Sequence, residues 1–428
     1  MSQGCESYRV AESKRSEDFG WQISRRGLLA TLSLGALLGA RSALGQVVLS
    51  EDAKDHQGDV IVNVFLRGGM DGLSAVVPYA EDAYHRARPN LRLRSPKDAS
   101  QGAAYQALDL DGFFGLNPAM AALLPLFKEG KMSFVHAAGS GDQTRSHFEA
   151  MNAMERGMYQ MRGGVQTGWI ARHLASTPRR TETPLRAVAL SATMPDSLRG
   201  ASHATAMESL TDFRLADPEM RDMLVSLYGS GQDVMTQAGR ETLDVLQKLS
   251  KIDVKLDPKK YPANSLGQAL QQVAVLIRSN VGLEVASLEM GGWDTHVAQG
   301  TVNGWLPSYL KDLAAALAAF EADMGPDMKR VTVIVQTEFG RRVEENTGLG
   351  TDHGRASTMF LMGGSVKGGR VFAEWPGLEK NQLDEVGDLR VTTDYRDVLA
   401  DALTKRAPGS NPTAVFPDWT AKKQGFFA

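Results

Sequence analysis

The sequence predicts an α/β protein in which helices cover both faces of a mostly parallel sheet. Two β-branched apolar runs, residues 59–66 and 331–335, have the nearly continuous apolar character of buried parallel strands. Segments with helical periodicity lie between such runs, for example at 305–324. Because strands that alternate with helices form parallel sheets covered on both faces, we expect an α/β/α sandwich.

The other expected elements continue this alternation. Asn117 and Pro118 begin a predicted helix that runs through Phe127, with Asn as the N-cap and Pro in the first turn. Further strands are expected at 132–137, 187–190, 283–288 and 357–362. Further helices are expected from about 146 and at 218–228, 240–251, 266–277 and 394–405. We predict one domain over 46–428, with a mainly helical insertion at about 205–280.

The N-terminal segment has the order of parts found in an export signal. Arg25 and Arg26 directly precede a moderately apolar run at 28–40, which is too short to span a bilayer, and small residues follow it. We therefore predict a twin-arginine signal peptide at 1–45, export through the twin-arginine translocase, and a periplasmic protein. The alternative is a chance arginine pair before a short buried helix.

The charge and cysteine content of residues 46–428 exclude several classes of function. Without the six basic and four acidic residues of 1–45, 41 basic and 46 acidic residues remain, a formal charge of −5. This charge predicts no nucleic-acid partner. The single cysteine, Cys5, lies in the predicted signal, so thiolate metal sites and cysteine nucleophiles are excluded. No later run is apolar enough for a membrane span.

Acidic residues and histidines follow the predicted strands, where ligands of open α/β sheets bind. Carboxylate and imidazole groups are ligands of hydrolytic metals such as zinc and manganese. The candidate metal ligands are Asp71, Asp294, His296, Glu338, Asp352 and His353. Each has a structural alternative: a turn aspartate at 71, a helix N-cap at 294–296, an ion pair of Glu338 with Arg341 or Arg342, and a turn at 351–354.

A second group of candidates lies at the start of the helix expected from about 146. Ser146 or Thr144 could act as nucleophile, activated by a metal or by His147, while Arg145 binds an anion. The alternative is a capping box between Ser146 and Glu149, which needs no catalysis.

The chain also resembles a bacterial family catalogued as domain of unknown function 1501, whose members commonly carry twin-arginine signals. The resemblance rests on VFLRGGMDG at 64–72, RSHF at 145–148, GGWDTH at 291–296, TEFGR at 337–341, GTDHG at 350–354 and TTDYRD at 392–397. That family is similar to the alkaline phosphatase and sulfatase superfamily, which implies an alkaline phosphatase-like domain with a two-metal site.

The superfamily resemblance implies roles for several of the candidate residues. Asp71 resembles the first-strand metal aspartate, and Asp294 with His296 resembles the central Asp/His pair. Either Asp352 and His353 match the superfamily's Asp-His-Gly motif, or Glu338 takes the place of that motif and His353 is the late histidine. We expect a divalent metal (zinc, manganese or calcium) and hydrolysis of a small phosphate or sulfate ester. The rival hypothesis is a non-catalytic exported scaffold that binds a ligand.

Overall fold

The computed structural model describes residues 58–159, 164–177, 183–211, 218–231, 233–252, 254–417, 419–422 and 424–428. The predicted signal peptide at 1–45 lies outside these residues. The chain divides into two compact units, one of which comprises Val47–Ala216 and Asp244–Ala428 and contains the main sheet. The other unit contains, among its described residues, helix α8 (Pro218–Tyr228) and the first part of α9 (Val234–Ser250).

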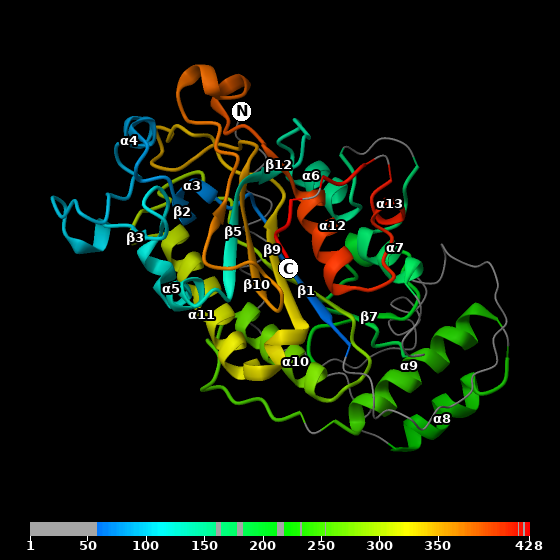
Figure 1. The fold of residues 1–428 in the computed structure, drawn as a ribbon. Helices are drawn as coiled ribbons and strands as arrows, with labels where there is room; N and C mark the ends of the chain where they lie inside the picture. Colours follow the sequence, from blue (N-terminus) through cyan, green and yellow to red (C-terminus); the bar gives the residue numbers. More distant parts are fainter. Residues whose placement is uncertain are drawn as a thin grey trace. The chain divides into compact units, whose positions relative to one another are not determined.

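The main sheet is mostly parallel, as predicted. Its central strand β1 (Val60–Leu66) pairs in parallel with β8 (Val285–Met290) on one side and β9 (Val331–Thr337) on the other. The strand order is β11-β5-β10-β9-β1-β8-β6-β7, and β12 pairs with β5 (Figure 1). The remaining strands are β5 (Met132–Gly139), β6 (Ala187–Leu190), β7 (Ala204–Met207), β10 (Ser357–Gly363), β11 (Val371–Phe372) and β12 (Thr393–Asp394). Strand β10 runs antiparallel to both of its neighbours.

The other elements are short strands and helices around this sheet. A small antiparallel sheet contains β2 (Val76–Val77), β4 (Gly115–Leu116) and β3 (Leu108–Asp109). The remaining α-helices are α3 (Gly72–Ala75), α4 (Asp82–Ala87), α5 (Leu124–Lys128), α6 (His147–Glu155), α7 (Trp169–Ser176), α10 (Ser265–Arg278), α11 (Trp305–Met324), α12 (Tyr395–Arg406) and α13 (Pro412–Val415). In the described part of the chain, 3-10 helical turns lie at Ala103–Tyr105, Pro118–Leu123, Asp196–Leu198, Gly325–Arg330, Lys380–Gln382 and Glu385–Gly387. No helix among the described residues is both long and apolar enough to cross a bilayer.

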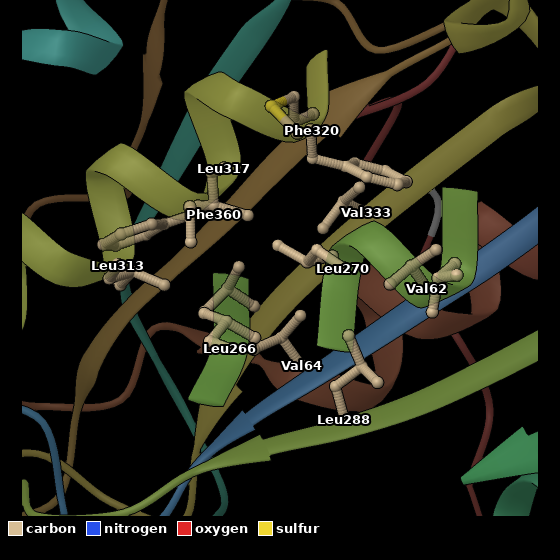
Figure 2. Close-up of a cluster of buried hydrophobic side chains, with 14 of the residues drawn as sticks. Val62, Val64, Leu266, Leu270, Leu288, Leu313, Leu317, Phe320, Val333 and Phe360 are labelled. Carbon is tan, nitrogen blue, oxygen red and sulfur yellow. The ribbon is translucent and has the colours of Figure 1, made fainter. Parts of the chain in front are cut away.

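Alternate residues of the central strand pack against helices on opposite faces of the sheet. Val62 and Val64 belong to a core that includes side chains of α10 and α11, such as Leu270 and Leu317 (Figure 2). Ile61 belongs to a second core that includes side chains of α7 and α12. Because successive side chains of a strand point to opposite faces, a strand that is buried along its whole length requires a covering layer on each side. The α/β prediction is confirmed.

Four loops meet at one edge of this sheet. Strands β1, β5, β8 and β9 all end there, since they run parallel to one another. Strand β10 begins at the same edge, because it runs in the opposite direction and its first residue, Ser357, pairs with Ala138 near the end of β5. The segments 67–71, 140–147, 291–296 and 338–356 are therefore brought together, although they are far apart in the sequence.

Candidate metal centre

Three side chains at this edge form a group that could hold a metal ion. They are His147 at the first turn of α6, Asp294 in the loop after β8, and His353 in the loop before β10. One ligand atom from each lies within 4.8 Å of the other two. Two imidazoles and a carboxylate are ligands that zinc and manganese accept.

The hydrogen bonds of His147 leave its Nε2 atom as the ligand atom. Its Nδ1 lies 2.7 Å from Glu338 Oε1. An ionised carboxylate only accepts, so Nδ1 carries the proton and donates it. In the neutral imidazole, Nε2 then has a lone pair, and this buried atom lies 3.4 Å from Asp294 Oδ1. A carboxylate that binds the far nitrogen of a metal-binding histidine is the usual supporting arrangement in metalloproteins.

His353 is oriented in the same way by a backbone group. Its Nδ1 lies 2.9 Å from the carbonyl oxygen of Arg145, which can only accept, so Nδ1 is again the donor. Its Nε2 lies 3.1 Å from Asp294 Oδ1. A third imidazole, that of His296, has its Nε2 2.9 Å from His353 Nε2 and 3.0 Å from Asp294 Oδ1. Three imidazole nitrogens thus surround one carboxylate oxygen.

Charge within the cluster shifts the pKa values of two of its members. Burial alone would lower the pKa of His147, but Asp294 and Glu338 outweigh it and raise this pKa to about 9. Burial would raise the pKa of Asp294, but hydrogen bonds from the three histidines and the charge of Arg341 bring it far below its usual value. Because metal ligands must be deprotonated, metal binding at His147 would release a proton.

Arg341 joins the loops that carry the cluster. Its guanidinium is buried, and it donates to the carbonyl oxygens of Gly68, Gly69, Trp293 and Thr351. It also donates to Asp294 Oδ1, at 2.7 Å. These carbonyl groups belong to the loops after β1 and β8 and before β10, so one side chain holds three segments in place.

Glu338 is completely buried and lies behind His147. Its Oε1 accepts from the backbone N–H of Gly68 at 2.7 Å as well as from His147, and its Oε2 accepts from the Thr337 hydroxyl at 2.9 Å. These groups, rather than Arg341 or Arg342, are its partners, so the ion pair considered as an alternative is wrong. Because both carboxylate oxygens already accept hydrogen bonds, Glu338 is positioned to support the candidate ligand His147 rather than to bind a metal itself.

Asp71 is not brought into the cluster. Its Oδ2 accepts from Arg88 at 2.6 Å, from the Ser74 hydroxyl at 2.7 Å and from Gln299 at 2.8 Å, and both charged side chains are fully buried. Burial would raise the pKa of Asp71, but Arg88 and these hydrogen bonds hold it below its usual value. The arrangement is a buried ion pair that supports the loop after β1.

Asp352 lies at the margin of the cluster. Its Oδ1 is 3.8 Å from His296 Nδ1 and accepts from the side-chain amide of Asn346 at 3.0 Å. Its Oδ2 lies 3.9 Å from Arg342. Asp352 therefore lies beside His296 and is not one of the three residues grouped as candidate ligands.

The candidate nucleophiles Ser146 and Thr144 and the proposed anion-binding Arg145 differ in burial and in hydrogen-bond partners. Ser146 is the half-buried N-cap of α6, and its side chain makes no cap hydrogen bond, so the capping-box alternative is wrong. Thr144 is exposed. The Arg145 guanidinium binds the buried Asp388 through Nε, at 2.9 Å, and through Nη2. Arg145 therefore serves the cluster through its carbonyl oxygen, which binds His353.

The family of the chain follows from its match to a family model. The model described as "Protein of unknown function (DUF1501)" matches residues 59–410. The chain belongs to the DUF1501 family. No curated protein matches it. All the cluster residues of this DUF1501 protein lie within the matched range.

The sequence suggests His147 as the activator of a hydroxyl, and the structure brings this residue together with Asp294 and His353. Two supporting residues of this DUF1501 site were not predicted. The missed residues are Arg341, considered only as a partner of Glu338, and Asn346. A signal for Asn346 exists in the sequence, because Asn346-Thr-Gly348 and Gly350 form a turn-rich segment directly before Asp352 and His353.

Proposed function

We propose that this protein is an exported, metal-dependent hydrolase of phosphate or sulfate esters with an alkaline phosphatase-like fold. The observation that carries the proposal is the orientation of two histidines. The Nδ1 atoms of His147 and His353 are held as donors by acceptor-only oxygens, so that both Nε2 atoms face Asp294. Ligands oriented in this way bind a metal without rearrangement.

The ligand types support zinc or manganese more than calcium. Calcium takes six to eight oxygen ligands, whereas imidazole nitrogen predominates here. A bound metal would polarise an ester oxygen and stabilise the negative charge that develops on it. Ser146 stands at the N-terminus of the nine-residue helix α6, next to the ligand His147, and is the candidate nucleophile closest in the chain to the cluster. Thr144 and a water molecule remain the alternatives.

Export through the twin-arginine pathway is part of this proposal. Its support is the arginine pair and apolar run within residues 1–45, which lie outside the described residues. Folded export suits a protein that takes up its metal in the cytoplasm, before it meets competing metals in the periplasm. The order of affinities among divalent metals makes such protection useful, because copper outcompetes manganese at most sites.

One observation favours the non-catalytic scaffold as a second candidate. Arg341 donates to the same Asp294 oxygen that the histidines surround, at 2.7 Å. A cation there competes electrostatically with a metal, and the histidines can bind Asp294 as donors once they are protonated. In that case the cluster would be a hydrogen-bonded support for the loops.

Metal analysis of the purified full-length product, together with a panel of phosphate and sulfate monoesters, separates the two candidates. We expect about one equivalent of zinc or manganese, and loss of metal and turnover in Asp294→Ala and His353→Ala. His85→Ala is the matched control, since His85 binds the carbonyl oxygen of Tyr79 outside the cluster. Less than about half an equivalent of metal, with no stabilisation by added metal, would refute the hydrolase proposal.

A further inference from the structure

Large apolar side chains are exposed on the segments that carry the candidate metal centre. Val297, which follows His296 in the chain, is 68% exposed, and Leu349, four residues before His353, is 50% exposed. We call these two residues the apolar lip. Exposed apolar side chains are common singly, but two on adjoining segments next to polar ligands form a surface suited to an apolar group.

The two segments of the lip are joined by backbone contacts. The N–H of Ala298 donates to the carbonyl oxygen of Gly348, and the N–H of Gln299 donates to that of Leu349, both at 2.9 Å. A Cβ added at Gly348 would lie 3.5 Å from Val297 Cγ2. The side chain of Val297 therefore lies against the turn that carries Leu349.

The lip is also in contact with the backbone of the cluster. A Cβ added at Gly350 would lie 2.2 Å from the carbonyl oxygen of His296, so the chain next to Leu349 packs directly on this residue. The Nε2 atom of His296 is 3.0 Å from Asp294 Oδ1. The apolar lip is therefore carried by backbone that contacts a residue of the cluster.

The turn that presents Leu349 is held in an unfavourable conformation. Leu349 has a φ of 57°, in the left-handed region that leucine rarely adopts. Asn346 maintains this turn, since its Oδ1 accepts from the N–H groups of Gly348 and Gly350, at 2.9 and 3.1 Å, and its Nδ2 donates to the His296 carbonyl oxygen at 3.0 Å. Such strain persists where the surroundings enforce it, and it is concentrated at functional sites.

We propose that the substrate carries an apolar alkyl or aryl group on its ester oxygen, and that Val297 and Leu349 bind this group. The inference rests on the proposed hydrolase function. In the reaction, water adds across the ester: the bond from phosphorus or sulfur to the ester oxygen breaks, and the acid keeps the oxygen of water. The ester oxygen takes up a proton and leaves as an apolar alcohol or phenol.

The test compares linear alkyl monoesters from methyl to octyl, as phosphates and as sulfates. If the lip binds the chain, kcat/KM rises by up to about fourfold for each methylene that leaves water, until the chain extends past the lip. Val297→Thr keeps the shape of the side chain, and Leu349→Asn suits a left-handed residue. Both variants should flatten the dependence of kcat/KM on chain length.

Val225→Ser, at an exposed position on helix α8, is the matched control and should keep the full dependence. The same chain-length series of alkyl phosphonates, which lack the ester bond, measures binding by calorimetry without turnover. Methyl ester turnover without any effect of chain length would overturn the apolar-group inference alone. Absence of both turnover and bound metal would refute the proposed hydrolase function. In that case, phosphonate binding that strengthens with chain length and is weakened by both lip variants would still support the binding of an apolar group by Val297 and Leu349.

A membrane role of the lip gives a different result. Vesicles of phosphatidylethanolamine and phosphatidylglycerol would then sediment with the wild-type protein and not with the double lip variant. Phosphonate affinity would be independent of chain length. That combination would overturn the inference, because the lip would bind a lipid surface rather than the apolar group of a substrate.

Discussion

Glu338→Gln tests whether the buried carboxylate behind His147 supports metal binding. The substitution keeps the size of the side chain and removes its charge. The amide oxygen can accept from Gly68 N–H and His147 Nδ1 as the carboxylate does, and the amide N–H₂ can donate to the Thr337 hydroxyl, which lies 2.9 Å from Glu338 Oε2. We therefore expect a folded protein whose free energy of unfolding falls by about 1 kcal/mol without metal.

Metal affinity should fall much more than stability. A neutral partner no longer increases the basicity of His147, and loss of such supporting groups weakens metal binding about 10- to 100-fold. This range corresponds to about 1.4–2.7 kcal/mol of binding free energy. The assay is competition with a chelator of known affinity, at one pH, for wild type and variant.

The matched control for this measurement is Glu345→Gln. The Glu345 carboxylate accepts from the backbone N–H groups of Asn90 and Leu91, at 3.0 and 2.8 Å, and is not part of the cluster. Its variant should bind metal as wild type does. A change of less than about threefold in Glu338→Gln would contradict the supporting role. Complete loss of metal would instead identify Glu338 as a ligand.

Three further substitutions test the surrounding structure. Asn346→Asp keeps the side-chain oxygen that accepts from the backbone N–H groups of the turn, but it replaces the amide donor with a negative charge beside Asp352. Competition with a chelator should then show a metal affinity about 10-fold weaker than that of wild type. An unchanged affinity would contradict a positioning role of Asn346. Arg88→Met leaves Asp71 buried without its partner, and urea unfolding should show a loss of about 3–5 kcal/mol; a loss below about 1 kcal/mol would be contrary evidence. His136 is fully buried, and burial lowers its pKa to about 4 although the hydrogen bond to the Val76 carbonyl opposes the shift. The same histidine in the unfolded chain binds its proton near pH 6.5. The free energy of unfolding should therefore fall by about 3 kcal/mol in total as the pH drops from 6.5 to 4. His136→Gln should show a shallower dependence in urea unfolding, and an equal slope would show that other groups cause it.

Much of the fold follows from periodicity, but strand direction does not. The predicted strand at 331–335 is extended to Thr337, and the strand predicted at 283–288 is β8 at Val285–Met290, because Glu284 pairs with Arg186 at the start and Gly291 follows its end. The antiparallel direction of β10 agrees with the connection before it, because residues 338–356 contain no helix and a parallel crossover usually requires one. Two-residue strands such as β11 are too short for any periodicity.

The site was predictable as a region and not as a list of ligands. Asp294, His296, Glu338 and His353 follow from the rule that ligands bind beyond strand ends. The same rule selects Asp71, whose side chain is instead drawn into the interior by Arg88, 17 residues later in the chain. Spacing along the chain cannot show which polar residue pairs with a distant partner.

The arrangement of the cluster follows from the fold rather than from a metal. Arg341 holds the loops after β1 and β8 and before β10 through backbone carbonyls, and these interactions need no ion. Glu338 and the Arg145 carbonyl fix the two histidine rings in the same way. The ligands therefore lose little further conformational freedom on binding, which favours affinity. The cost is the contact of Arg341 with Asp294, so a metal must compete with a fixed positive charge. Metal affinity at this edge of the sheet is thus a balance between a prepared geometry and an opposing charge, and both arise from the same arginine.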